Sequence, residues 1–306
     1  MQHINLIIAD SLFNLVKLLS VVEEYFKEPF YLTKNIEGLS SLETAQLNNF
    51  VKRLLDAGKI QGVINLDDLM RISYNNILLS STFGKELASK LLITRYNKIS
   101  FIENDYKDYV SLSESEKKLN NRSHYDYEVL FNDSTLYLSK PDLFTKPKCY
   151  SELKPIHLSK SIMEILRRDF LKYEEVFNLS KDTPVVFLDT FFDDHVVYEY
   201  IPAVYHYLED TYEKQTLLIK YSDENNKKVI PRNVDIVDCD YKMPNELLNY
   251  FFTGRKYIFS INNVLLFAND FATVQLLKVR SDSEEYNEKI DTLLENNFNG
   301  LQIKEI

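Results

Sequence analysis

Polar residues follow several short apolar runs in this 306-residue chain, at the points where a strand would end. The apolar run 217–219 leads into Lys220, whose ammonium can neutralise a phosphate as a point charge. A later run leads into Ser260, Asn262 and Asn263. Their hydroxyl and amide groups, with nearby backbone N–H groups, can donate hydrogen bonds to the same anion. These residue types suit a phosphorylated ligand.

Ionisable side chains follow a third apolar run, 185–188. Asp193 or Asp194 can take the proton from an attacking sugar hydroxyl, and His195 can act instead as the base or as an acid for a leaving group. Aspartate, serine and asparagine at strand-to-helix junctions are also ordinary helix caps. Taken singly, each residue favours the capping interpretation, and only their joint placement favours a site.

Strand-like and helical patterns alternate along the chain, which predicts an α/β fold with mainly parallel sheets. Ser11 is the expected N-cap of the first helix, and Gly58 closes the second. The polar stretch 111–148 is predicted to be irregular surface structure with some short extended pieces. We expect strands at 4–9, 30–33, 76–80, 98–103, 183–189, 215–220, 234–237, 257–260 and 275–279, and helices at 11–26, 44–57, 85–92, 159–170, 194–213, 245–252 and 281–297.

The two β/α runs on either side of the stretch 111–148 predict two Rossmann-like domains facing a cleft. The expected divisions are an N-terminal domain 1–158, a C-terminal domain 159–280 and a C-terminal helix 281–306. Parallel sheets bind ligands outside the carboxyl ends of their strands. The polar residues that follow the strands are therefore the candidate site.

Composition excludes several classes of protein. The formal net charge is −10, without a long basic block, which disfavours nucleic acid as a partner. Two cysteines match no zinc or redox spacing, and the five histidines form no metal-binding pattern. Only 6 glycines are present, and no phosphate-binding loop, dinucleotide fingerprint or serine-hydrolase elbow occurs.

The N-terminus favours a cytoplasmic protein. Its apolar run 4–8 follows no basic segment and is interrupted by Asp10, unlike a secretory signal. No apolar run approaches the 18 or so residues that a membrane-spanning helix needs. Location at the inner-membrane surface and a homodimer are both left open.

The ordered strand ends resemble those of bacterial sialyltransferases of glycosyltransferase family 52 and, more distantly, bacterial polysialyltransferases. The resemblance covers most of the chain. The segments that carry it are 76–81 followed by 98–105, then 188–194, 218–223, 243–248 and 259–263. The resemblance implies a GT-B architecture, in which two Rossmann-like domains hold the substrates and the C-terminal domain holds the nucleotide sugar.

The resemblance also implies an activity. It predicts metal-independent, inverting transfer of sialic acid or a related sugar from a CMP-activated donor to a bacterial surface glycan, such as lipopolysaccharide or capsule. The expected partners are thus a nucleotide sugar and a glycan acceptor, with no cofactor. The family's catalytic aspartate falls at Asp193 or Asp194. The positions implied to bind the donor are Lys220, Ser222, Ser260, Asn262 and Asn263, and those implied to face the acceptor are Glu103 and Asp105.

Three departures from the family pattern leave alternatives open. Ser222 stands where the family has a histidine, Asp105 replaces a glycine, and Asn262 and Asn263 replace serines. A serine cannot act as the acid that an imidazole can. Three hypotheses therefore stay open. The chain is a glycosyltransferase whose donor differs or in which His195 substitutes, it is a catalytically degenerate binding or scaffolding protein, or it is an unrelated α/β interaction module.

Overall fold

The computed structural model divides the chain into two compact units, Met1–Leu171 (unit 1) and Lys172–Ile306 (unit 2). In unit 1 it describes residues 3–81, 83–104, 134–141 and 150–169. In unit 2 it describes residues 185–188, 206–207, 210–211, 218–221, 247, 250–251, 256–259, 273–278, 284, 287–288, 291, 294 and 301–305. The division follows residue 171 rather than the predicted residue 158.

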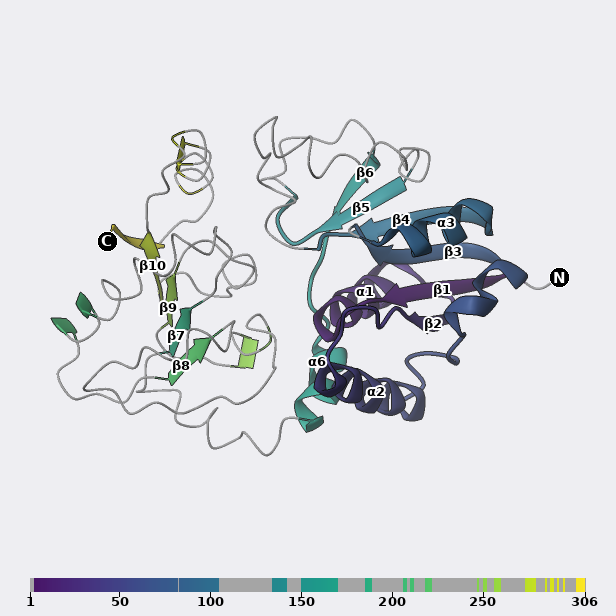
Figure 1. The fold of residues 1–306 in the computed structure, drawn as a ribbon, viewed down its shortest axis with the longest axis horizontal. Helices are drawn as coiled ribbons and strands as arrows, with labels where there is room; N and C mark the ends of the chain where they lie inside the picture. Colours follow the sequence, from purple (N-terminus) through teal and green to yellow (C-terminus); the bar gives the residue numbers. More distant parts are fainter. Residues whose placement is uncertain are drawn as a thin grey trace. The chain divides into compact units, whose positions relative to one another are not determined.

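Unit 1 contains a six-stranded sheet in which every pair of neighbouring strands is parallel (Figure 1). Its strand order is β2-β1-β3-β4-β5-β6. The chain moves outward from β1 to β2 and then returns to β3 on the other side of β1, so the order reverses between β1 and β3. The strands are β1 (Ile4–Ala9), β2 (Phe30–Lys34), β3 (Ser73–Ser80), β4 (Arg95–Ile102), β5 (Ser134–Leu138) and β6 (Tyr150–Pro155).

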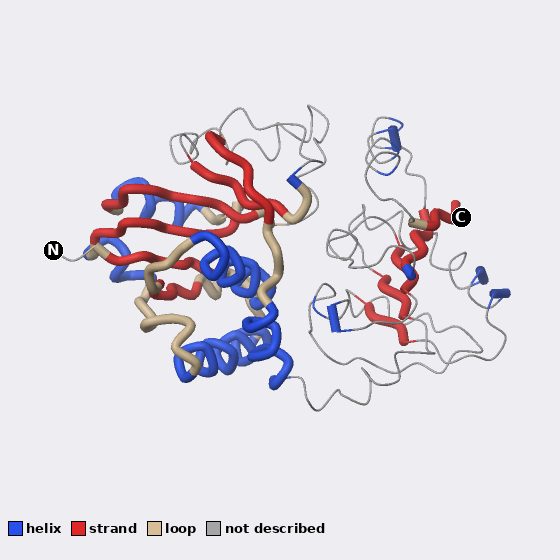
Figure 2. Tube along the Cα trace, turned by 180° about the vertical axis from the view of Figure 1, so that it is seen from behind, coloured by secondary structure: helices blue, strands red, loops and turns tan. Residues whose placement is uncertain are grey.

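Helices pack in two groups around this sheet. The helices α1 (Leu12–Tyr25), α2 (Ser41–Asp56) and α6 (Lys160–Arg167) contact one another (Figures 1 and 2). The 3-10 helix η1 (Leu66–Arg71) contacts α3 (Lys85–Ile93). Crossovers between parallel strands are right-handed, and those of α1 and α3 run in opposite directions along the sheet. Helices α1 and α3 therefore cover opposite faces of the sheet.

The core of unit 1 is centred on β1 and α1. Every residue of α1 from Leu12 to Val22 is buried, and β1 is buried from Asn5 onward. A helix with few polar residues belongs in the interior. This explains why α1 packs against the sheet with little exposed surface. Ser11 caps it as predicted, its hydroxyl accepting a hydrogen bond from the backbone N–H of Asn14.

Helix ends in unit 1 follow the predicted chemistry. Ser40 and Glu43 form a capping box at the start of α2, three residues before the predicted start at Thr44. Gly58 follows the end of α2 at a φ of +68°, the left-handed conformation expected of a glycine in this position. Beyond it the chain makes an isolated parallel bridge between Val63 and Leu32 in place of a full strand.

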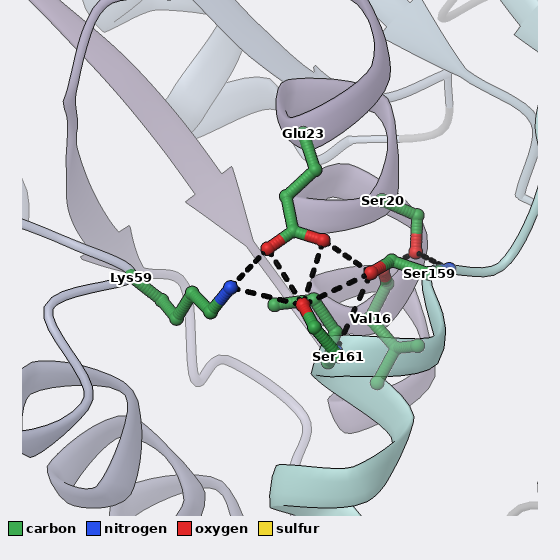
Figure 3. Close-up of polar contacts among 7 residues, drawn as sticks. Val16, Ser20, Glu23, Lys59, Ser159 and Ser161 are labelled. Atoms are coloured by element: carbon green, nitrogen blue, oxygen red, sulfur yellow. Dashed lines mark hydrogen bonds and ion pairs between the residues drawn. The ribbon is translucent and has the colours of Figure 1, made fainter.

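Helix α6 is held to unit 1 by a polar cluster beneath α1 (Figure 3). The Glu23 carboxylate accepts hydrogen bonds from the hydroxyls of Ser159, the N-cap of α6, and Ser161, and pairs with the Lys59 ammonium. The Ser159 backbone N–H donates to the Ser20 hydroxyl at 2.9 Å. Burial raises the pKa of Glu23, but the bonds from Lys59, Ser159 and Ser161 outweigh it and lower that pKa overall. This helix, predicted as part of the second domain, therefore packs in unit 1.

Unit 2 contains a second sheet, again parallel at every described pairing. Its strand order is β11-β10-β9-β7-β8, so it too reverses direction beside its first strand, β7. Its strands are β7 (Val185–Leu188), β8 (Leu218–Tyr221), β9 (Lys256–Phe259), β10 (Val274–Lys278) and β11 (Gln302–Glu305). Both units thus begin with the doubly wound order 2-1-3-4-5.

The last segment differs from the prediction. Residues 281–306 were expected to end the chain as a helix, and positions 284, 287, 288, 291 and 294 are helical. Residues Gln302–Glu305, however, form β11 at the edge of the sheet. The Lys278 ammonium of β10 pairs with carboxylates of Asp291 and Glu305, which fixes this end of the chain against β10.

Candidate functional site

A polar cluster lies at the carboxyl edge of the unit 1 sheet, where the strand order reverses. Asp10 directly follows β1, Ser80 is the last residue of β3, and Glu103 and Asn104 directly follow β4. In doubly wound parallel sheets, ligands bind outside the carboxyl ends of the strands at such a switch point. The backbone therefore brings these side chains to the edge where a ligand site is expected.

Side-chain hydrogen bonds join the members of this cluster. The Asn14 amide of α1 donates to Asp10 Oδ1 at 2.8 Å and to Asn104 Oδ1 at 3.1 Å. The Ser80 hydroxyl donates to the same Asn104 oxygen at 3.2 Å. Three strand ends and one helix thus hold a carboxyl, two amides and a hydroxyl together. These groups suit recognition of a ligand that carries hydroxyls.

The Asp10 carboxyl is the group best suited to proton transfer in this cluster. It is half-buried, and that burial raises its pKa above the ordinary aspartate value, although hydrogen bonds from Asn14 and Ser80 and the charge of Lys17 oppose the shift. A raised carboxyl pKa lies nearer to neutral pH, where a general acid or base works best. Perturbed titratable groups concentrate at functional sites.

Lys17 supports the cluster from within α1. Its side chain is only 1% exposed. Its ammonium donates hydrogen bonds to the backbone carbonyls of Glu103, at 2.7 Å, and Asn104, at 3.1 Å, and lies 4.9 Å from the centre of the Phe13 ring. A buried ammonium needs such partners. Lys17 therefore fixes the backbone after β4, which in turn places Asn104.

Glu103, predicted to face an acceptor, lies at this edge but is 1% exposed. Its carboxylate oxygen Oε2 accepts hydrogen bonds from the Ser139 backbone N–H at 2.9 Å and hydroxyl at 3.2 Å. These bonds tie the end of β4 to the residue that follows β5. The described geometry thus gives Glu103 a role in joining strand ends, and its predicted role toward an acceptor stays a prediction.

Lys220 is described through its backbone alone. It lies within β8, which continues to Tyr221, and pairs in register with Phe187 of β7. The sequence predicted a strand over 215–220 with Lys220 at its end, and β8 ends one residue later. The other predicted site residues lie outside the described residues, and their roles stay predictions: Asp105, Asp193, Asp194, His195, Ser222, Ser260, Asn262 and Asn263.

Sequence reasoning missed the central members of this cluster. Asp10 was interpreted only as an interruption of an apolar run, and Asn14 and Lys17 were passed over within the first helix. A signal was present in the spacing, because Asn14 and Lys17 are three residues apart and so share one helical face, and Asp10 lies four residues before Asn14, next to the Ser11 cap. Polar residues on the inward face of an otherwise apolar helix need partners, and those partners are the strand ends.

Two searches of the described chain bear on classes of site. Among those residues, no group of three or more histidine, cysteine, aspartate or glutamate side chains could hold a metal ion. None of the helices in the described ranges is long and apolar enough to span a bilayer.

Comparisons with known proteins give a distant structural likeness. No protein-family model matches the chain, and no curated protein is significantly similar to it. The crystal structure of the glycosyltransferase SnogD from Streptomyces nogalater aligns with a TM-score of 0.46 and 12% sequence identity, covering 95% of this chain and 85% of that one. A likeness at this level carries no argument about the reaction or the substrate. The α/β class and the parallel sheets rest on this chain's own topology.

Proposed function

We propose that this chain is a metal-independent, inverting glycosyltransferase that transfers sialic acid or a related sugar from a CMP-activated donor to a bacterial surface glycan. The observation that carries the proposal is the switch-point cluster of Asp10, Asn14, Ser80 and Asn104 in unit 1. A carboxyl, amides and a hydroxyl at this edge are the groups that hold a sugar by its hydroxyls. The cluster supports an acceptor site in unit 1.

The donor side of the proposal rests on the sequence resemblance. It places a nucleotide phosphate near Lys220, Ser222 and Ser260, and the catalytic aspartate at Asp193 or Asp194. In support, the described strands of unit 2 form a doubly wound parallel sheet, and such sheets bind nucleotides at their carboxyl edges. A GT-B arrangement of the two units and a cytoplasmic location belong to the same proposal.

A catalytically degenerate binding protein is the second candidate. It is favoured by Ser222, which stands where the resembling family has a histidine. A serine hydroxyl has no pKa near neutrality with which to protonate a leaving group. This candidate predicts nucleotide binding without turnover.

Thermal unfolding with CMP, CDP, UDP and GDP tests the proposal. A ligand that binds only the folded state at 100 times its Kd stabilises it by about 2.7 kcal/mol. That corresponds to a rise in Tm of about 5–10 °C for a unit of this size. We expect this rise with CMP, a loss of it in Lys220→Ala and Ser260→Ala, and no loss in the exposed control Lys52→Ala.

Turnover separates the two candidates. Sugar transfer from CMP-activated sialic acid that is abolished in Asp194→Ala supports the enzyme, whereas CMP binding with no transfer from any nucleotide sugar supports the binding protein. A shift with UDP or GDP alone would keep the transferase and discard the CMP donor. No shift with any nucleotide would refute both.

A further inference from the structure

We infer that Asp10 is the residue of unit 1 that binds the attacking hydroxyl of the acceptor sugar and takes its proton. This inference rests on the proposed function and assigns the base to Asp10 in place of Asp193 or Asp194, the positions that the sequence resemblance implies. It starts from position, because Asp10 is the first residue beyond the carboxyl end of β1 and the sheet reverses its order beside β1. A ligand at a switch point meets this residue first.

The surroundings of Asp10 distinguish it from Glu103, the other carboxylate among the described residues at this edge. Glu103 is buried and bound to Ser139. Asp10 is less deeply buried, and part of its surface remains open to solvent. Partial exposure combined with fixed geometry suits a general base, since it must lie within hydrogen-bond reach of the proton that it takes.

Hydrogen bonds fix the carboxyl in place without neutralising it. The Asn14 amide holds Oδ1 at 2.8 Å, and the Asn104 side chain, itself bound by Ser80, holds the Asn14 amide. Of the charged groups around the carboxyl, Lys17 of α1 acts on it directly, but its ammonium is committed to two backbone carbonyls. Asn14, Ser80 and Asn104 carry no charge. Asp10 therefore keeps the capacity to accept a proton.

The chemical step balances within the proposed reaction. The acceptor oxygen forms a bond to the anomeric carbon of the donor sugar while its proton passes to the Asp10 carboxylate. The bond from that carbon to the phosphate oxygen breaks, and its electron pair leaves with the nucleoside monophosphate. Asp10 then releases its proton to water after the product departs.

Transfer from CMP-activated sialic acid to lactose, measured between pH 5 and 9, tests the inference. Asp10→Asn keeps the oxygen that Asn14 binds, so we expect the variant to fold. Loss of a general base lowers kcat about 10²–10⁴-fold, and the acidic limb of the pH profile should disappear while the CMP-induced rise in Tm persists. The matched control Asp56→Asn, an exposed aspartate at the end of α2, should behave as wild type. A wild-type profile in Asp10→Asn, or loss of the acidic limb in Asp194→Asn instead, would overturn the assignment.

A binding measurement separates this inference from the proposed function. Saturation-transfer NMR with a panel of neutral mono- and disaccharides that includes lactose needs no donor. Sugar binding that Asp10→Asn weakens at least tenfold supports a sugar site at Asp10, even if the wild type transfers nothing and the proposed function fails. Absence of sugar binding by the wild type, or equal binding by both proteins, overturns the inference.

Discussion

Replacing Lys17 by methionine tests whether a buried ammonium holds the backbone at the site. Methionine keeps a long apolar stem and a favourable contact with the Phe13 ring, so the change removes the charge and its donors with little loss of packing. It leaves the backbone carbonyls of Glu103 and Asn104 without the ammonium that now lies 2.7 Å and 3.1 Å away. The substitution therefore removes the two hydrogen bonds together with the charge.

The expected cost follows from those two bonds. A buried acceptor left unsatisfied costs about 1–3 kcal/mol, so two of them cost about 2–6 kcal/mol. Removing the buried charge recovers part of this, since desolvating an ion is itself unfavourable. We expect a net loss of about 2–4 kcal/mol in the free energy of unfolding of unit 1. At about 2–4 °C per kcal/mol, the Tm should fall by roughly 5–15 °C.

Urea unfolding monitored by far-UV circular dichroism measures this loss, with Lys52→Met as the matched control. Lys52 is exposed on α2, and such changes usually stay within about 0.5 kcal/mol. A second readout is the pKa of Asp10, which should rise further in Lys17→Met because the charge of Lys17 now lowers it. A Lys17→Met protein as stable as the wild type would refute the reasoning that this ammonium fixes the end of β4.

Three further predictions concern single residues of unit 1. Because burial raises the pKa of Asp10 in the folded state, its carboxylate weakens the fold as pH rises above the ordinary value of 3.8. The stability of Asp10→Asn relative to wild type should therefore increase as pH is raised from 3 to 8, and a pH-independent difference in urea unfolding would contradict this. Ser40→Ala removes half of the capping box that Ser40 forms with Glu43 and should lower the free energy of unfolding by about 1 kcal/mol. Thermal unfolding measures this loss, and an unchanged stability would count against the cap. The methyl group added by Gly58→Ala meets no neighbouring atom, but the alanine must adopt a φ of +68°. Chemical denaturation should therefore show a loss of about 1–2 kcal/mol in the free energy of unfolding, and an unchanged midpoint would mean that the turn relaxes.

The central elements of the fold could be predicted from the sequence because local and tertiary preferences agree there. The apolar run of β1, the Ser11 cap and the helical spacing of α1 all indicate the same structure, and the described residues confirm it. Gly58 marks the end of α2 for a backbone reason that does not depend on the rest of the molecule.

Two of the edge strands, β6 and β11, were missed because their stability comes from pairing rather than pattern. Residues Tyr150–Pro155 of β6 and Gln302–Glu305 of β11 lie at the ends of their sheets, where β6 is partly exposed and β11 is exposed throughout. Neither has the apolar run or strict alternation that predicts a strand. Hydrogen bonds to a neighbouring parallel strand decide their conformation, and no local window of sequence contains that neighbour.

The strand-end argument pointed to the carboxyl edge of the unit 1 sheet but did not name the central residues of the polar cluster that lies there. The strand-end argument found Glu103, whereas the geometry centres on Asp10, Asn14 and Asn104. Which residues share one edge depends on strand order, and sequence periodicity does not give strand order. The polar face that runs through Asn14 and Lys17 of α1 became meaningful only once β4 was placed beside it.

The attachment of α6 to α1 has a consequence for synthesis on the ribosome. Unit 1 is one continuous stretch, and its last helix docks on its first through Ser159 and Glu23. Domains of multidomain chains generally fold as units, the N-terminal one first, as the chain emerges. Unit 1 can therefore close only after its final helix has left the exit tunnel. Until then Lys59 and Glu23 lack the two serines that complete their cluster, and a pause in translation after α6 has emerged would give this docking time to occur.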